Sequence, residues 1–429
     1  MSDLPQPVVH LSAVLRSPLL DRAGERLGRV EDLIVRLADG GYPPVTGLKA
    51  RIGGRELFVP VDKIATLAPD AVRLSGEKLS LGKFERRPGE VLLRADVLGH
   101  RLIDVETAHL IKAADLELEQ RDGEWVLTGV DTHRRRGGLG ALFTRGAPDP
   151  GPYAFREWAA FEPLIGHASS AVLRRPFARI RRLKPAQIAD LLEDASKAEE
   201  TEILGQVRAD PELEADVFEE LDEDLARRLL GARTDAEIAG VLSRMRADDA
   251  ADAVAELPQP RREPVLDLMP PGQRTKVMTL LGFNPTSAGG LMGVDFLALA
   301  PSVRVTEALA AVGQSQTLQP EALTTVHAVA EDGYLHGVAK LVTLLQADPE
   351  ASLADVSDSD PVRVGAATDV VDVAVLMSDY NLITIPVVDE RRRMIGIITV
   401  DDVLETTLPA DWRRREAAQP PDAHVGDGP

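Results

Sequence analysis

The sequence contains no cysteine, which excludes a disulfide framework, thiolate metal sites and cysteine nucleophiles. It also lacks an uninterrupted apolar run of about 20 residues, the length that a membrane-spanning helix needs. The nearest candidate, at 280–300, is interrupted by Pro285, several glycines and Asp295. The N-terminus has no basic region followed by an apolar core, so it does not resemble a signal peptide. These absences predict a cytoplasmic protein with no transmembrane segment.

The charge of the 429-residue chain is strongly negative but unevenly placed. The net charge is −20, and residues 190–257 carry 21 acidic against 7 basic side chains, whereas residues 134–184 carry 11 basic against 3 acidic ones. The acidic stretch disfavours a nucleic-acid surface and suits cations or a basic partner, although a solvated helical face has the same composition. Residues 132–184 are rich in glycine, proline and arginine, which predicts a basic linker with a short helix.

Residues 8–131 alternate apolar and polar residues in short runs separated by glycine and proline, which predicts strands and turns. The segment that contains Leu20, Asp21 and Asp32 can be laid on the segment that contains Ile103 and Asp104, and this predicts two copies of a small β unit. The run "LLDRAGERLGRVEDLIVRL" and the later "RELFVPVDKI" resemble the PRC-barrel family. That resemblance implies a docking module rather than a catalytic one.

Residues 185–286 change to a period of 3.6, with apolar residues at i, i+3, i+4 and i+7 in stretches such as "PAQIADLLEDA" and "AEIAGVLSRMRADDAADAVAEL". Comparable apolar positions recur through the segment at Ala195, Leu221, Met245 and Met269. The recurrence predicts a superhelix of short α-helices in which neighbours bury one another's faces.

Residues 287–408 contain a helix–strand–strand–helix order twice, at 287–355 and 356–408, before a polar tail at 409–429 that we expect to be disordered. In the second unit, Thr399 lies where a strand meets a helix, and Asp402 follows three residues later. This spacing suits a phosphate on the helix end and a ribose diol on the carboxylate, and it equally suits a helix N-cap with early acidic residues.

The stretch "IPVVDERRRMIGIITVDDV" resembles the second half of a cystathionine-β-synthase (CBS) domain. The adenosine-binding signature of that family falls here on Gly396, Thr399 and Asp402. The resemblance therefore implies an adenine nucleotide such as ATP as a ligand. The first unit departs from the signature, with Lys340 and Thr343 at the hydroxyl and carboxylate positions.

A second group of candidate residues contains only carboxylates. Asp248 and Asp252 lie four apart on one predicted helix face, where like charges cost roughly 0.2–0.5 kcal/mol unless a cation offsets them. Oxygen ligands without histidine or cysteine favour Mg²⁺ or Ca²⁺ over zinc. The alternative is an acidic face exposed to water.

The order of the acidic superhelix, the "SAGGLM" joint at 287–292 and the paired CBS units resembles the cytosolic half of the MgtE family of magnesium channels. The resemblance implies Mg²⁺ bound between the superhelix and the CBS pair in a closed state, nucleotide that tunes the response, and a homodimer through the CBS domains. Val371 and Asn381 stand where that family has acidic residues. The interfacial carboxylates implied here are Asp216, Asp248, Asp252, Asp369, Asp402 and Glu405.

The sequence thus predicts a multidomain α+β protein with a duplicated PRC-like β-barrel, a central α-superhelix and a C-terminal CBS pair. The family's pore is expected after "VLETT", where this chain has its polar tail, so we expect regulation of a partner such as a membrane transporter rather than transport. The leading hypothesis is a magnesium-sensing cytoplasmic regulator, located at the membrane when its partner is there. The alternatives are an adenine-nucleotide sensor and a PRC-led scaffold or ribosome-associated factor. No enzymatic constellation is present.

Overall fold

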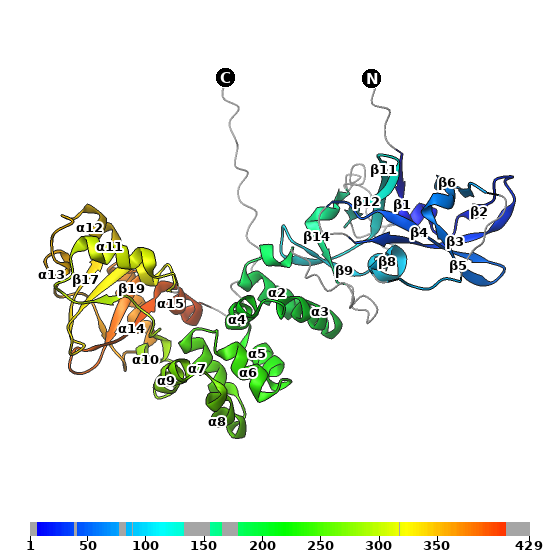
Figure 1. The fold of residues 1–429 in the computed structure, drawn as a ribbon. Helices are drawn as coiled ribbons and strands as arrows, with labels where there is room; N and C mark the ends of the chain where they lie inside the picture. Colours follow the sequence, from blue (N-terminus) through cyan, green and yellow to red (C-terminus); the bar gives the residue numbers. More distant parts are fainter. Residues whose placement is uncertain are drawn as a thin grey trace, which may run out of the picture. The chain divides into compact units, whose positions relative to one another are not determined.

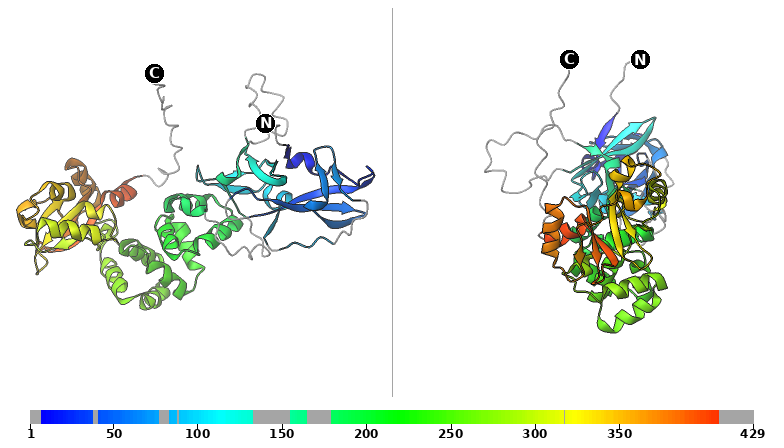
Figure 2. Two further views of the ribbon diagram at one scale, coloured as in Figure 1. Left: turned by 45° about the horizontal axis from the view of Figure 1, so that its top comes forward. Right: turned by 90° about the vertical axis from the view of Figure 1, so that its left-hand side faces the viewer.

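The computed structural model describes residues 7–37, 41–76, 83–87, 89–132, 155–164, 179–316 and 318–408. The predicted tail at 409–429 and most of the predicted linker at 132–184 lie outside these residues. The described chain is a multidomain α+β protein with a β-rich N-terminal part, a series of short helices and a C-terminal pair of small mixed α/β units (Figure 1, Figure 2).

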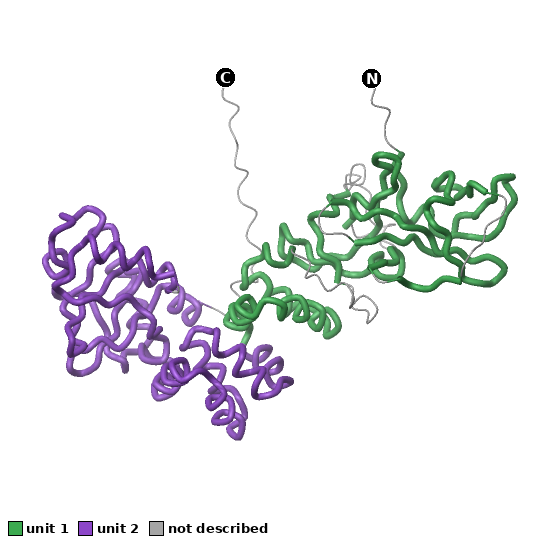
Figure 3. Tube along the Cα trace, in the orientation of Figure 1, with its two compact units in different colours: residues 1–222 green, residues 223–429 purple. Residues whose placement is uncertain are grey.

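The chain divides into two compact units, residues 1–222 and residues 223–429 (Figure 3). The division falls between two helices of the predicted superhelix, so the first three of its helices share a unit with the β-rich part. Each unit is therefore described by itself.

The β-rich part of the first unit folds into three sheets around one apolar core. The largest sheet has seven strands in the order β5-β4-β3-β2-β7-β6, with β8 paired to β3; the others have the orders β1-β11-β12-β13 and β10-β9-β14. The elements are β1 (Val8–His10), α1 (Leu11–Val14), β2 (Pro18–Leu20), β3 (Arg26–Arg36), β4 (Val45–Ile52), β5 (Arg55–Pro60), η1 (Val61–Lys63), β6 (Ile64–Leu67), β7 (Val72–Leu74), β8 (Glu90–Leu92), η2 (Leu93–Val97), β9 (Arg101–Asp104), β10 (His109–Lys112), β11 (Asp115–Arg121), β12 (Glu124–Asp131), β13 (Arg156–Glu157), η4 (Trp158–Ala160) and β14 (Phe161–Pro163).

Equivalent hydrogen bonds occur in the two predicted copies of the β unit, which are the two halves of this β-rich part. Arg16 and Gly99 both have left-handed backbones, with φ of 67° and 82°. The Arg16 N–H donates to the Val30 carbonyl at 2.9 Å, and the Gly99 N–H donates to the Ala113 carbonyl at 2.8 Å. Glycine adopts this conformation without steric cost, whereas arginine is strained there. The two halves therefore share a local geometry, and the resemblance to PRC barrels stays a prediction.

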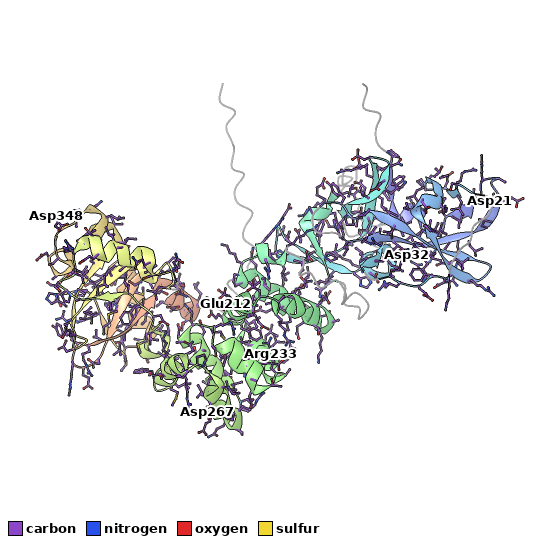
Figure 4. The ribbon with its side chains drawn as sticks, in the orientation of Figure 1. Asp21, Asp32, Glu212, Arg233, Asp267 and Asp348 are labelled. Atoms are coloured by element: carbon purple, nitrogen blue, oxygen red, sulfur yellow. The ribbon has the colours of Figure 1, made fainter. Side chains whose placement is uncertain are left out.

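Two buried aspartates, Asp32 and Asp115, serve equivalent structural roles in these halves. Asp32 accepts hydrogen bonds from the Arg94 and Ala95 N–H groups of η2 at 2.7 and 3.1 Å, and Asp115 accepts one from the Ser12 N–H of α1 at 3.0 Å. Each carboxylate thus satisfies the N–H groups of a short helical turn that comes from the other half. Figure 4 labels Asp32 within the strands. Both positions have a structural function.

Arg101 of β9 joins the β-rich part to the first helices. Its guanidinium donates to Glu199 Oε1 at 2.9 Å and to Asp194 Oδ2 at 3.0 Å. The Arg101 side chain remains 31% exposed, so these bonds are partly screened by water. The remaining elements of this unit are η5 (Ile180–Arg182), α2 (Pro185–Asp194), α3 (Lys197–Val207) and α4 (Pro211–Glu219).

The second unit begins with five short helices, of which α5 packs on α7, α6 on α8 and α7 on α9. They are α5 (Glu223–Gly231), α6 (Asp235–Leu242), α7 (Ala247–Glu256), α8 (Gln259–Leu268) and α9 (Pro271–Leu280). This alternate packing is the arrangement that the apolar period predicts. Two stretches that read as continuous in the sequence are each divided into two helices: Glu220–Asp222 separates α4 from α5, and Ser243–Arg246 separates α6 from α7.

The C-terminal part of the second unit repeats one small sheet. In each copy the first strand is parallel to the second and the second is antiparallel to the third: β15-β16-β17, then β18-β19-β20. The elements are α10 (Ala288–Leu291), β15 (Ala298–Leu299), α11 (Val305–Gln314), η6 (Ala322–Thr324), β16 (Thr325–Val329), β17 (Leu335–Lys340), α12 (Leu341–Gln346), α13 (Leu353–Val356), β18 (Val364–Gly365), α14 (Val370–Asp379), β19 (Thr384–Val388), β20 (Met394–Thr399) and α15 (Val400–Thr407).

The glycine-rich joint after α9 fastens the helices to the second of these copies. A Cβ on Gly289 would lie 2.6 Å from the Phe283 ring, and one on Gly290 would lie 2.3 Å from the Asn284 carbonyl oxygen. The Gly289 N–H also donates to the Ala366 carbonyl at 2.8 Å. Larger side chains would force these segments apart. The joint therefore fixes where α7 lies relative to β20 and α15 within this unit.

Candidate functional site

The junction between β20 and α15 is a helix N-cap. The N–H of Thr399 donates to Asp402 Oδ2 at 3.0 Å, and its hydroxyl donates to the same oxygen at 2.6 Å. Thr399 is 4% exposed and Asp402 8%. The pair forms a capping box, in which each residue satisfies the other's backbone or side-chain donors. The capping alternative raised by the sequence is thus present in the structure.

Gly396, the third residue of the nucleotide signature, is a point of close backbone approach. It pairs with Val387 across the sheet, and a Cβ at this position would lie 2.7 Å from Met292 Sδ and 2.9 Å from the Gly293 carbonyl oxygen. Any larger side chain would collide with the segment that follows α10. This glycine is therefore required by packing.

Arg246, at the N-cap of α7, reaches across to the junction. Its Nη1 donates to Asp402 Oδ1 at 2.9 Å, and its Nε donates to Asp249 Oδ2 at 2.6 Å. Its Nη2 lies 3.8 Å from Asp248 Oδ2. A weaker contact of 3.5 Å joins Nη1 to Gln319 Oε1 in the first CBS-like copy. One guanidinium thus contacts carboxylates from two elements that are far apart in the sequence.

The carboxylates around Arg246 are strongly affected by burial. Asp248 is 7% exposed, and burial raises its pKa to about 8; the negative charges of Asp249 and Asp402 add to the shift, whereas Arg246 opposes it. The pKa of an acid rises in such surroundings because the buried charged form loses its hydration. The Arg246 guanidinium opposes this rise, and its two short hydrogen bonds go to Asp249 and Asp402.

Asp252 lies one turn further along α7. Its side chain reaches solvent, yet the atoms packed around it raise its pKa to about 6, and Asp249, Glu223 and Glu256 add to the shift. Arg227 lies 3.6 Å from Glu223 and 2.7 Å from Glu256, so part of the negative charge on this outer face of α7 is already paired.

A small cavity lies beside the contact between α7 and α15. Its volume is about 180 Å³, which is below the roughly 300–1,000 Å³ of typical small-molecule pockets. Polar side chains from both elements line it together with the segment after α10. The lining residues are Arg244, Met245, Arg246, Ala247, Asp248, Gly293, Val294, Asp295, Gln319, Ala322, Ile397, Thr399 and Asp402.

The other predicted metal ligands are dispersed. Asp216 is exposed on α4 in the first unit, where burial and then Glu212 raise its pKa. Asp369 is an exposed N-cap that accepts the Val371 N–H of α14 at 2.9 Å, and Glu405 is exposed on α15. Val371 and Asn381 are also exposed. The structure therefore brings together only Asp248 and Asp402 among the predicted ligands in this unit.

The residues around Arg246 do not fit Mg²⁺ in this arrangement. Mg²⁺ requires oxygen ligands at about 2.0–2.1 Å in octahedral geometry. Among the described residues, no group of three or more His, Cys, Asp or Glu side chains is arranged to hold a metal ion. A guanidinium lies between Asp248, Asp249 and Asp402 instead. Metal binding by the six predicted carboxylates stays a prediction.

Arg246 is the residue that inspection of the sequence missed. It precedes Asp248 by two positions, so a basic side chain beside the acidic run was visible in the sequence. Its partner Asp402 is 156 positions away, and no local periodicity reveals such a pairing.

Comparison with known proteins assigns the two halves of this contact. The model of the MgtE intracellular N domain matches residues 183–286, and the model of the CBS domain matches residues 353–408. The chain carries an MgtE N domain followed by a CBS domain. Arg246 and Asp248 thus belong to the N domain, and Thr399 and Asp402 to the CBS domain.

Relatives of known function are magnesium transporters named MgtE. The Thermus thermophilus protein is 36% identical over 164 residues, which cover 37% of this chain and 36% of that protein. The Bacillus subtilis protein is 24% identical over 231 residues, covering 53% of this chain and 50% of that protein. This chain thus spans about a third to a half of these relatives. No helix among its described residues is long and apolar enough to cross a membrane.

Solved structures show the same fold. The cytosolic domain of the Mg²⁺ channel MgtE in complex with ATP is 28% identical with a TM-score of 0.50, covering 54% of this chain and 93% of that one. The soluble part of a magnesium transporter also has a TM-score of 0.50, at 22% identity, and covers 54% of this chain and 90% of that one.

Proposed function

We propose that this chain is a regulatory module of magnesium transport in which an adenine nucleotide opens the contact between the N domain and the CBS domain. The observation that carries the proposal is the double use of Asp402. One carboxylate oxygen caps α15 through Thr399, and the other accepts the Arg246 guanidinium. The element that would bind nucleotide is therefore also the element that closes the contact.

Nucleotide binding and closure compete for the same group. The signature residues Gly396, Thr399 and Asp402 are all present, and Thr399 and Asp402 line the cavity. With about 180 Å³, that cavity is below the usual range for ligand pockets. A ribose diol on Asp402 would displace Arg246 from the same carboxylate. A ligand that binds one of two states better shifts the population toward that state, and here it favours the open one.

Magnesium transport as the regulated process is inferred from the relatives. The matched transporters are named for magnesium, and the similar solved domain binds ATP. The matched families are regulatory and ligand-binding domains, which supports binding rather than catalysis in this chain. We extend this to a cytoplasmic location and to a membrane transporter as the regulated partner.

A homodimer through the CBS domain is part of the proposal. Apolar side chains remain exposed along α14 and beside it, at Val371 (59%), Val375 (52%), Tyr380 (57%), Ile383 (49%) and Leu404 (46%). Val371 and Val375 are one turn apart and share a helix face. Exposed apolar patches of this kind mark interaction surfaces. A second copy of the chain would cover them.

Magnesium sensing is the second candidate function, favoured by the outer face of α7. Asp252 is exposed there, and Asp249, Glu223 and Glu256 add to the rise in its pKa that the atoms packed around it cause. Divalent cations at such a face would relieve the repulsion. Small-angle scattering across a millimolar magnesium series tests it: a smaller radius of gyration supports sensing, and an unchanged one in both the parent and Asp252→Asn opposes it.

Calorimetric titration of the full chain with ATP, ADP and AMP, each with and without Mg²⁺, tests the main proposal. We expect saturable binding in the parent and its loss in Asp402→Asn. Asp372→Asn is the matched control, because it removes an exposed first-turn carboxylate of α14. The proposal is abandoned if no adenine nucleotide binds, or if Asp402→Asn binds as the parent does.

A further inference from the structure

Three carboxylates and one guanidinium meet where α7 contacts α15. Asp248 and Asp249 come from the first turn of α7 and Asp402 from the first turn of α15. Asp248 and Asp402 are 7% and 8% exposed, so water screens their charges little. Arg246 lies 2.6 Å from Asp249, 2.9 Å from Asp402 and 3.8 Å from Asp248. Without a cation between them, the carboxylates of Asp249 and Asp402 would repel each other.

The chemistry of arginine suits this position better than that of a bound ion. Its guanidinium is planar, permanently charged and weakly hydrated, and its donors form a fork that can bond two carboxylates at once. Arg246 uses Nε for one helix and Nη1 for the other in this way. A divalent ion among the same oxygens would also face repulsion from the guanidinium. The two cations therefore exclude each other.

We propose that Arg246 is the built-in counter-ion of the contact between α7 and α15, so that this contact closes without a divalent cation. The inference rests on the proposed function, in which this contact is the controlled element. It departs from the metal-bridged closure that resemblance to MgtE implies. Because the guanidinium is tethered, closure at this contact does not follow the concentration of free Mg²⁺. Magnesium acts on this chain at other carboxylates or through its partner.

The variant Arg246→Gln removes the counter-ion while it keeps a polar side chain at this position. Glutamine keeps a polar side chain of similar reach but carries no charge. The three carboxylates then lose their counter-ion, and the contact opens in a chelator. Added Mg²⁺ can occupy the vacated position and restore the contact. The variant thus acquires a metal dependence that the parent does not have.

The experiment measures the distance between spin labels on the full chain. Because the sequence has no cysteine, the changes Glu263→Cys on α8 and Glu390→Cys in the turn after β19 give two unique attachment sites. Both positions are exposed and outside the contact. Pulsed electron resonance then records the distance distribution in EDTA and in millimolar MgCl₂.

We expect one narrow distribution in the parent, unchanged between EDTA and MgCl₂. Arg246→Gln should lose the parental peak in EDTA and regain it in MgCl₂, whereas Arg246→Lys should keep it in both. Arg274→Gln is the matched control, because Arg274 of α9 forms an ion pair with Asp267 of α8 at 2.7 Å and does not line the cavity. Circular dichroism confirms that each variant is folded.

Two results would overturn the proposal. One is a parental distance that shifts when Mg²⁺ is added. The other is an Arg246→Gln distribution that matches the parent in EDTA. If either occurs while the parent still binds nucleotide in an Asp402-dependent way, only the counter-ion role fails. If nucleotide binding is also absent, the proposed function fails independently.

Discussion

Replacement of Glu162 by glutamine should stabilise the first unit at alkaline pH. Glu162 of β14 is fully buried, and among the described residues neither of its carboxylate oxygens has a hydrogen-bond partner. Burial raises its pKa to about 8; the positive charge of Arg179 opposes the shift, and Glu202 adds to it. Ionised Glu162 is therefore a destabilising element of the native state.

The sign and size of the effect follow from linkage. In the unfolded chain Glu162 has its ordinary pKa, about 4.3, so the native state binds the extra proton between that pH and about 8. Stability is greatest below the lower value and falls as the pH rises through the window, by at most about 1.4 kcal/mol per pH unit. A glutamine side chain at this position resembles the protonated acid and removes this loss. We expect a gain of about 1 kcal/mol at pH 5 and of about 4–5 kcal/mol at pH 8, so that the gain rises between them by an amount on the order of 3 kcal/mol.

Tryptophan fluorescence during urea unfolding measures this difference. Trp125 and Trp158 both lie in the first unit, so a Trp412→Phe background confines the signal to it. An increase in the gain on the order of 3 kcal/mol widens the difference in urea midpoint by about 1–2 M. Glu124→Gln, at an exposed position of β12, is the matched control and should show no pH-dependent difference. A variant that is less stable than its parent at pH 8, or a difference that is the same at pH 5 and pH 8, would refute the reasoning.

Two further changes test the packing around the site and the attachment of the first helices. Gly396→Ala should lower the unfolding temperature of the second unit at a cost of about 1–3 kcal/mol, because the new alanine Cβ would lie 2.7 Å from Met292 Sδ. Scanning calorimetry measures this change. Gly365→Ala is the control and should be neutral, because a Cβ there would meet only Thr368 Oγ1, at 3.9 Å. Arg101→Ala should weaken the hold on α2 and α3 by about 1 kcal/mol, since its bonds to Glu199 are partly screened; hydrogen exchange of α2 should become faster, and unchanged protection would contradict the role.

Local patterns in the sequence predicted the elements of the fold well. The 3.6-residue period located the helices of the N domain, because an amphipathic helix needs the same apolar spacing wherever it packs. The breaks at 220–222 and 243–246 were not predicted, because no proline or glycine marks them. Both breaks depend on packing between neighbouring helices, which a local pattern does not contain.

The site was predicted only in part for a related reason. Thr399 and Asp402 were predicted from their local spacing, which is the same in a helix N-cap and in the nucleotide-binding signature. That spacing alone could not distinguish a capping role from a nucleotide-binding role. The approach of Asp248 to Asp402 was expected from resemblance. The position of Arg246 between them could not be read from the sequence, because it depends on the glycine-rich joint that sets α7 against α15.

The most direct test of the central claim compares ATP binding by the parent and by Arg246→Gln in calorimetry without added Mg²⁺. If Arg246 competes with nucleotide for Asp402, its removal makes the free carboxylate available. We expect Arg246→Gln to bind ATP about tenfold more tightly than the parent, a difference of about 1.4 kcal/mol, and Arg274→Gln, which changes an ion pair outside the cavity, to bind as the parent does. Equal or weaker binding by Arg246→Gln would contradict the account.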